Sequence, residues 1–287
     1  MRGRPRDVQR NPKRKSNPFQ ASRKPAFTTY DERVRLAGRT IDVISTPALR
    51  HDAPTLVFLH EGLGSIALWR DFPEQISART GCGTVVYSRY GNGFSETLHE
   101  PRAVDYMHAE ALTVLPELLD ALHVERPILI GHSDGASIAL IYASAYPRNV
   151  RGLVLEAPHV VVEDVSVKSI AAIAETYRTT DLREKMARYH ADVDATFYGW
   201  NDIWLAPAFR SWSIVDLLPS VAAPALAIQG IDDEYGTLAQ LNLLAHNSRG
   251  TTDRLVLARC AHAPHRDRPN VVAGAVSEWI AAVARPG

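Results

Sequence analysis

The chain has 287 residues, of which 46% are hydrophobic and 22% charged, so it can bury one large domain and has an ordinary globular composition. We find no apolar run of transmembrane length and no N-terminal secretion signal, so we expect a cytoplasmic protein without membrane contact. Two cysteines are too few for a disulfide framework.

The charges are unevenly distributed, although the formal net charge is zero. Residues 1–27 carry nine Lys/Arg and one acid, Asp7, whereas the rest of the chain carries 23 basic and 31 acidic residues. Because these 27 residues also lack apolar periodicity, they are predicted to be a disordered basic tail. A solvated extension is the favoured interpretation, and we expect no nucleic-acid partner.

Short apolar runs predict the strands of a sheet from residue 28 onwards. Arg39–Ser45 alternates weakly, which predicts a first strand or hairpin arm, and Thr55–His60 (TLVFLH) predicts a buried parallel strand before a Gly-rich turn. The other predicted strands are Thr84–Tyr87, Arg126–Gly131, Arg151–Glu156, Ala225–Gln229 and Arg254–Leu257.

Helical patterns alternate with these strands. Asp105–Leu122 has helical spacing interrupted by Pro116, an Ala-rich helix is expected up to about Tyr146, and Val271–Val283 predicts a terminal helix. The alternation predicts an α/β fold with a mostly parallel, doubly wound sheet, formed by residues 28–159 and 219–287. Residues 160–218 are charged, aromatic and helical without a clear strand, which predicts an inserted helical cap.

The pentapeptide Gly131-His-Ser-Asp-Gly135 is the most informative motif. It lies between a predicted strand and a predicted helix, with Ser133 at the corner. Flanking glycines are needed at such a sharp turn, where a strained serine projects its hydroxyl outward. The pattern therefore predicts a nucleophilic serine.

A serine hydroxyl needs a base, an acid that orients the base, and donors for the developing oxyanion. Carboxylates follow one late strand, in Gly230-Ile-Asp-Asp-Glu234, and histidines follow the last, in Cys260-Ala-His-Ala-Pro-His265. The resulting chain order of serine, acid and histidine is the order of an α/β-hydrolase sheet and differs from that of the two common serine-protease folds.

These motifs resemble the α/β-hydrolase-fold serine hydrolases of the capped, single-domain kind, which include small esterases and C–C bond hydrolases. The resemblance covers about residues 28–285. It implies Ser133 as the nucleophile, His262 as the general base and Asp233 as the acid, with Asp232 as the alternative. It also implies an oxyanion hole formed by the backbone N–H groups of Asp134 and Gly62. Glu61 occupies a position that is usually glycine in the family, so it is the alternative donor.

The remaining candidates concern binding. Glu61 places a carboxylate near the site, where it either binds a cationic substrate group or points into solvent. Aromatic residues of the predicted cap are expected both to pack on the core and to line a substrate pocket, and those assigned to the pocket are Trp200, Trp204, Phe209 and Trp212. His60, His132 and His265 are interpreted as structural, and no metal or cofactor is expected.

The predicted function is hydrolysis of a small carboxylic ester, thioester or lactone through an acyl-enzyme. The first alternative is hydrolysis of a C–C bond in a meta-cleavage-type diketone. The second is a nicotinamide-dependent oxidoreductase, because Gly62-Leu-Gly-Ser-Ile-Ala67 matches the dinucleotide fingerprint G-x-G-x-x-A. Against it, the next strand ends in Ser88-Arg89 and lacks the acid that would bind a ribose. The oligomeric state is left open.

Overall fold

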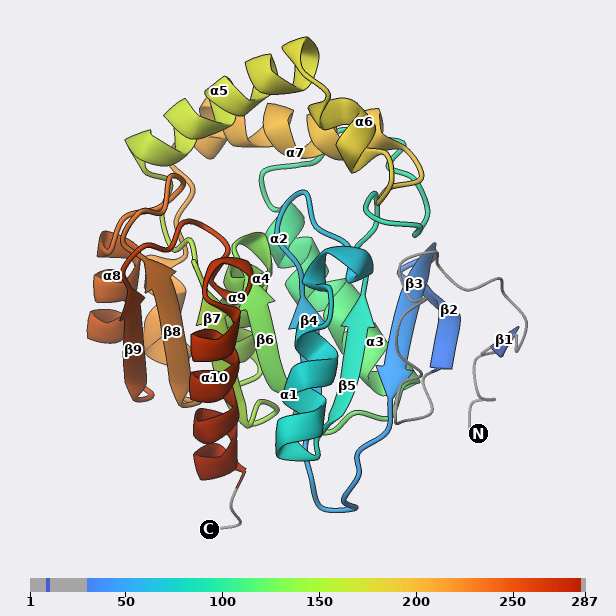
Figure 1. Cartoon of the computed structure of the whole chain (residues 1–287), viewed down its shortest axis with the longest axis vertical. Coiled ribbons are helices and arrows are strands. Elements are labelled where there is room, and N and C mark those ends of the chain that lie inside the picture. The colour runs from blue at the N-terminus through green and yellow to red at the C-terminus, as the bar shows by residue number, and fades with distance from the viewer. Residues whose placement is uncertain (1–8, 11–29, 285–287) are drawn as a thin grey trace.

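The apolar runs of the sequence form the centre of one β-sheet in the computed structural model, which describes residues 9–10 and 30–284. Its strands are β1 (Gln9–Arg10), β2 (Tyr30–Leu36), β3 (Arg39–Thr46), β4 (Thr55–Leu59), β5 (Gly83–Tyr87), β6 (Ile128–His132), β7 (Gly152–Glu156), β8 (Ala225–Gly230) and β9 (Thr252–Leu257). Within the described residues they lie in the order β1-β2-β3-β5-β4-β6-β7-β8-β9. Strands β4 to β9 pair in parallel, whereas β1, β2 and β3 pair antiparallel. The predicted mostly parallel sheet is therefore confirmed (Figure 1).

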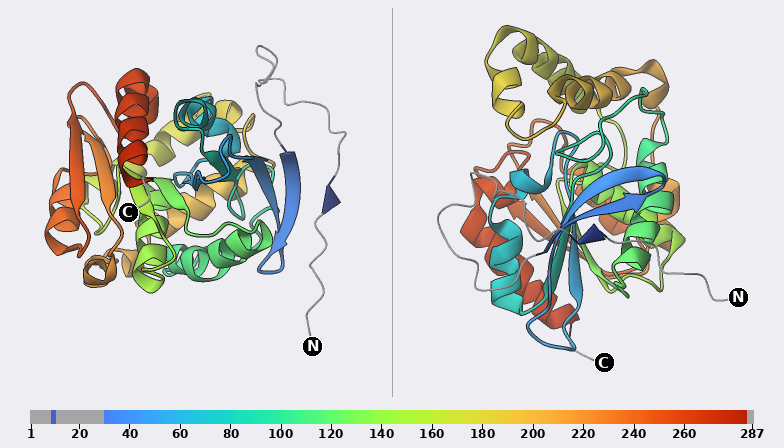
Figure 2. Two further views of the ribbon diagram at one scale, coloured as in Figure 1. Left: turned by 90° about the horizontal axis from the view of Figure 1, so that it is seen from below. Right: turned by 90° about the vertical axis from the view of Figure 1, so that its right-hand side faces the viewer.

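Helices cover both faces of this sheet, which explains why its central strands β5 to β8 are mostly apolar and buried along their length. On one face lie α1 (Phe72–Thr80) and α10 (Pro269–Val283), and on the other lie α3 (Leu115–Ala121), α4 (Asp134–Ala145) and α8 (Ala239–Asn247), as the left view of Figure 2 shows. Successive side chains of a strand alternate between the two faces. Accordingly Leu56 and Phe58 pack with α1 and α10, and Val57 and Leu59 pack with α3 and α4.

The N-terminal edge differs in part from the prediction. The predicted strand Arg39–Ser45 corresponds to β3, but it pairs with β2, which was not predicted because charged residues occupy every second position. Val34 and Leu36, on the opposite face of β2, are buried and carry the alternating signal. The predicted disordered tail, residues 1–27, lies outside the described residues except for Gln9–Arg10, which form the short strand β1 where no structure was expected.

The predicted helix over residues 105–122 is present but irregular. It consists of α2 (Tyr106–Ala109), a π-helical segment (Glu110–Val114) and α3. Pro116 follows directly, and because proline lacks an N–H group it cannot donate the regular helical hydrogen bond. The wider π turn accommodates this interruption within the helix.

A group of helices lies over the carboxyl ends of the parallel strands, at the top of Figure 1. It comprises α5 (Asp164–Thr179), α6 (Leu182–Met186) and α7 (Val193–Leu205), followed by short 3₁₀ helices at Pro207–Phe209 and Val215–Ser220. The two ends of this insertion pair with each other through an antiparallel bridge between Val161 and Ser213. The division of the chain into a core and a cap at residues 160 and 218 stays a prediction.

None of the helices within the described residues combines the length and the apolar character that crossing a membrane requires.

Candidate active site

The candidate site lies where the direction of strand addition reverses. The chain passes from β4 to β5 on one side and returns to β6 on the other side of β4, so β4 and β6 are neighbours. In open α/β sheets, ligands bind beyond the carboxyl ends of the strands at such a reversal. The turn after β4 contains Gly62, and Ser133 directly follows β6, so the topology brings both to this position.

Ser133 is held in a strained turn between β6 and α4. Its φ of 54° and ψ of −119° lie in a region that L-residues rarely adopt. The flanking glycines permit this turn: a Cβ on Gly131 would clash with the Gly135 carbonyl, and one on Gly135 would clash with the Leu59 carbonyl. The close approach of β6 to the start of α4 therefore requires glycine at 131, and the close approach of the turn to β4 requires glycine at 135.

The three side chains predicted to act together lie within hydrogen-bonding distance. The Ser133 hydroxyl lies 2.9 Å from Nε2 of His262, and Nδ1 of His262 lies 2.8 Å from Oδ1 of Asp233. They come from the turn after β6, the loop after β9 and the turn after β8. This geometry allows the imidazole to accept the serine proton while the carboxylate binds the opposite ring nitrogen.

Asp233, and not its neighbour Asp232, faces the imidazole. The Asp233 side chain is 1% exposed, and its carboxylate also accepts hydrogen bonds from the backbone N–H groups of Tyr235 and Gly236 and from Nε2 of Gln229. Burial works against ionisation, but the hydrogen bond and charge of His262 outweigh it, together with the Tyr235 N–H group, and lower the pKa of Asp233. The Asp232 residue is exposed.

The backbone N–H groups of Gly62 and Asp134 have no hydrogen-bond acceptor among the residues that the structure describes. The first lies in a tight turn closed by a 2.9 Å hydrogen bond from the Gly64 N–H to the Glu61 carbonyl, and the second starts α4. The alternative donor, the N–H of Glu61, helps to lower the pKa of the Glu61 carboxylate itself. These contacts favour Gly62 as the donor from this turn.

The Glu61 side chain contacts a protein group and does not point into solvent. Its carboxylate lies 3.4 Å from Nδ1 of His132, and it is 20% exposed. Burial opposes both charges, but the close contact and opposite charge of the two groups outweigh it, so the pKa of Glu61 lies well below its usual value and that of His132 above it. Nε2 of His132 donates to the carbonyl of His262 at 2.7 Å, so this ion pair supports the loop of the candidate base.

The aromatic residues assigned to the pocket fall into two groups. Trp200 packs its indole edge directly against Gly62, so that a Cβ at Gly62 would clash with it. The ring of Trp204 lies 5.0 Å from that of His159, between ring centroids. Phe209 and Trp212 instead stack on each other at 5.4 Å in the main core, and the structure does not bring them to the triad.

Sequence reasoning missed two rings beside the candidate base. The His159 and Tyr235 rings lie 5.7 and 4.8 Å from that of His262. Burial, with a smaller contribution from His262, lowers the pKa of His159 to about 4, so this imidazole is neutral. Both residues follow the carboxyl ends of parallel strands, β7 and β8, and this position was the available signal.

The histidines interpreted as structural make protein contacts. His60 donates from Nδ1 to the Glu61 carbonyl at 2.7 Å and accepts the Arg89 N–H at Nε2, at 2.9 Å. His265 lies 2.7 Å from the Glu156 carboxylate and packs its ring against Trp69. In the part of the chain that the structure describes, no three His, Cys, Asp or Glu side chains are grouped in a way that could hold a metal ion.

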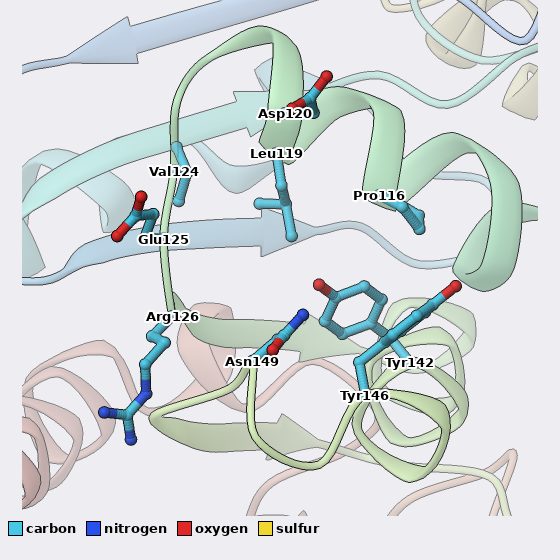
Figure 3. A pocket seen from close by; sticks show the side chains of 9 residues that line it. All are labelled: Pro116, Leu119, Asp120, Val124, Glu125, Arg126, Tyr142, Tyr146 and Asn149. Carbon is cyan, nitrogen blue, oxygen red and sulfur yellow. The ribbon is translucent and has the colours of Figure 1, made fainter.

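Two surface pockets lie away from the triad. One, shown in Figure 3, lies between α3 and α4, where Leu119 faces Tyr142 and Tyr146. Its residues Val124–Arg126 precede β6, so it lies at the opposite end of that strand from Ser133. A second pocket lies between residues 98–102 and α7, and neither is lined by Ser133 or His262. Ser133 itself is 6% exposed beneath the helices.

Comparison with known proteins identifies the class to which this fold and site belong. The family model described as alpha/beta hydrolase fold matches residues 54–202. The chain therefore belongs to the alpha/beta hydrolase fold family and is a hydrolase of that family. Consistent with this, the fingerprint Gly62–Ala67 is followed by a 3₁₀ helix, Ile66–Trp69, and lacks the α-helix start that a dinucleotide site needs.

Individual relatives differ in the reactions that their names describe. The chain is similar to a proline iminopeptidase from Lactobacillus delbrueckii subsp. lactis, at 22% identity over 80% of this chain and 90% of the relative. A 2-hydroxy-6-oxo-6-phenylhexa-2,4-dienoate hydrolase from Rhodococcus sp. strain RHA1 shares the fold with a TM-score of 0.72, at 15% identity over 88% of this chain and 99% of the other. A thermophilic esterase from Thermogutta terrifontis has a TM-score of 0.67, at 17% identity over 89% and 99%.

Proposed function

We propose that the protein hydrolyses a small carboxylic ester, or a related thioester or lactone, through an acyl-enzyme formed on Ser133. The observation that carries this proposal is the continuous chain of contacts from the Ser133 hydroxyl through His262 to Asp233, at 2.9 and 2.8 Å. The low exposure of Ser133 supports a small substrate.

In the proposed reaction, Oγ of Ser133 attacks the ester carbonyl carbon while Nε2 of His262 accepts its proton. The negative charge that develops on the carbonyl oxygen is stabilised by the N–H groups of Gly62 and Asp134. The tetrahedral intermediate then expels the alkoxide, which takes the proton from His262, and Ser133 retains the acyl group. A water molecule, deprotonated by His262, attacks the acyl-enzyme carbonyl carbon. The second tetrahedral intermediate expels Oγ of Ser133, which takes the proton back from His262, and the carboxylic acid is released.

Two other reactions, release of an N-terminal proline and C–C bond hydrolysis, are the alternatives that the substrate panel below distinguishes. An iminopeptidase must bind a substrate amine, but Glu61, the carboxylate beside the donor turn, is already paired with His132. C–C bond hydrolysis uses a similar triad and cap, and the structural likeness at 15% identity supports the fold alone.

The test is turnover by the wild type and Ser133→Ala. The panel contains p-nitrophenyl esters of increasing acyl length, an aryl thioester, L-proline p-nitroanilide and a 2-hydroxy-6-oxohexa-2,4-dienoate. We expect ester turnover with a burst of p-nitrophenol, and a loss of about 10⁶-fold in kcat for Ser133→Ala. Turnover of the dienoate or the anilide without turnover of any ester would refute the proposal. A fluorophosphonate that fails to label Ser133 would refute the acyl-enzyme.

A further inference from the structure

Arg89 is a buried charge that the proposed reaction does not use. It follows β5 in the segment Ser88–Ser95, and its side chain is 1% exposed. Its Nη2 group donates to the Glu61 carbonyl at 2.9 Å and lies 3.5 Å from the Asp134 carboxylate. The same guanidinium therefore contacts both turns that carry the candidate oxyanion donors.

The contact with the Glu61 carbonyl determines where the Gly62 N–H points. A carbonyl and the N–H of the next residue belong to one planar trans peptide and point in opposite directions. Holding the carbonyl of Glu61 therefore fixes the direction of the Gly62 N–H. His60 Nδ1 and the Gly64 N–H also donate to this carbonyl, but both belong to the same turn and shape that turn alone.

The second turn is held through its side chain. Asp134 provides the other N–H donor, and its buried carboxylate accepts a 2.6 Å hydrogen bond from the Tyr106 hydroxyl beside the ion pair with Arg89. Burial disfavours the charged guanidinium, but Asp134 and then Glu110 outweigh it and raise the pKa of Arg89. A charged Arg89 thus attracts the start of α4 towards the turn after β4.

The network also reaches the helices above the sheet. The Tyr106 hydroxyl accepts a 3.1 Å hydrogen bond from Nε1 of Trp204, which lies on α7. Contacts therefore run from α7 through Tyr106 and Asp134 to Arg89 and the Glu61 carbonyl. One set of buried polar groups therefore connects α7 to both turns that carry the oxyanion donors.

We propose that Arg89 is a positioning residue that sets the distance between the two oxyanion donors and, through Tyr106 and Trp204, links that distance to the position of α7. This inference rests on the proposed function, because the oxyanion hole has a role only if the reaction passes through a tetrahedral intermediate. The competing explanation is that Arg89 only neutralises the buried charge of Asp134.

The double variant Arg89→Met/Asp134→Asn separates the two explanations, because it removes both charges and retains the Asp134 backbone N–H. With p-nitrophenyl butyrate, positioning predicts that kcat falls about 10- to 100-fold, less than the 10²- to 10³-fold loss from deleting a donor. We expect KM to change less than about threefold. Butylboronic acid, whose serine adduct places an oxygen in the hole, should bind more weakly by the same factor as kcat. The exposed pair Arg178→Met/Glu175→Gln on α5 is the matched control and should leave all three quantities unchanged.

A double variant that folds and keeps the wild-type kcat would overturn the inference while leaving the proposed function intact. If the double variant does not fold, Arg89→Lys is the alternative test. It keeps a positive charge beside Asp134 but replaces the planar guanidinium with an ammonium point charge. A wild-type kcat in Arg89→Lys would also overturn the inference. Tyr106→Phe tests the link to α7, because it removes both the hydrogen bond to the Asp134 carboxylate and the one from Trp204. We expect kcat and boronate affinity to fall together by about tenfold or more, and unchanged values would refute the link. A wild type without ester turnover would refute the proposed function, and this inference with it.

Discussion

Replacing Asp233 with asparagine tests the proposed division of roles within the triad. The carboxylate accepts hydrogen bonds at both oxygens, from His262 and backbone N–H groups on one side and from Gln229 on the other. An amide keeps one acceptor and turns the other into a donor, which must then face either His262 or Gln229. It also loses the negative charge that favours protonated His262.

The expected magnitude follows from the charge. Two unit charges about 4 Å apart in an effective dielectric constant of about 20 attract each other by about 4 kcal/mol. At about 1.4 kcal/mol for each factor of ten, this corresponds to about 10³ in rate. The wrong imidazole tautomer increases the loss towards the roughly 10⁴-fold found when the corresponding aspartate of a serine protease becomes asparagine. We therefore expect kcat of Asp233→Asn to fall by 10³- to 10⁴-fold, roughly.

The assay is kcat for a p-nitrophenyl ester, together with the urea midpoint of unfolding to exclude a folding defect. Asp232→Asn is the matched control, since Asp232 is adjacent in the chain but exposed, and we expect its kcat to stay within about twofold of the wild type. The assignment would be wrong if Asp233→Asn kept more than about a tenth of the wild-type kcat, or if Asp232→Asn lost as much activity.

Two predictions concern stability. Gly135→Ala places a Cβ against the Leu59 carbonyl and should lower the free energy of unfolding by about 3 kcal/mol, measured by urea denaturation. Glu61→Gln removes the partner of His132 and should cost about 2 kcal/mol between roughly pH 4.5 and 6.5. Because folding raises the pKa of His132, this group stabilises the folded protein fully below the ordinary histidine pKa. That stabilisation is lost as pH rises through the pKa of His132 in the folded protein. Because folding lowers the pKa of Glu61, this group stabilises the folded protein fully above the ordinary glutamate pKa, and that stabilisation is lost as pH falls through the pKa of Glu61 in the folded protein. The stability difference between Glu61→Gln and the wild type should therefore shrink at both low and high pH.

Each stability prediction has a result that contradicts it. Gly274→Ala is the control for Gly135→Ala, because a Cβ at Gly274 in α10 would meet no atom within 4 Å and should stabilise the helix by about 0.5–1 kcal/mol. Equal effects of the two substitutions on the free energy of unfolding would show that the contact between residue 135 and the Leu59 carbonyl imposes no penalty on a Cβ. For Glu61→Gln, a stability profile that runs parallel to the wild type from pH 4 to 9 would exclude the ion pair.

Much of the fold was predictable because its signals are local. A parallel strand buried on both faces is a continuous apolar run, and Thr55–Leu59 and Gly152–Glu156 follow this rule closely. Strand β2 was not predicted because every second side chain of it is exposed, and its charged residues concealed the alternation of Val34 and Leu36. The turn at Ser133 was predictable for a related reason, since its backbone strain requires glycines at fixed positions.

Side-chain partners that depend on distant segments were not predictable. Glu61 was expected to meet a ligand or solvent, but it pairs with His132, 71 positions along the chain, because neighbouring strands bring their turns together. No role was predicted for Arg89 or His159. Phe209 and Trp212 had the composition of a pocket, but they stack on each other within the core.

The sequence by itself determined the order of the elements, the strained serine turn, and the succession of serine, acid and histidine at strand ends. These depend on periodicity and on turn chemistry, which act over a few residues. Only the tertiary structure decided that Glu61 pairs with His132 and that Arg89 joins the two donor turns. The physical reason is that hydrogen-bond direction and burial are set by where separate strands end, and no short stretch of sequence contains that information.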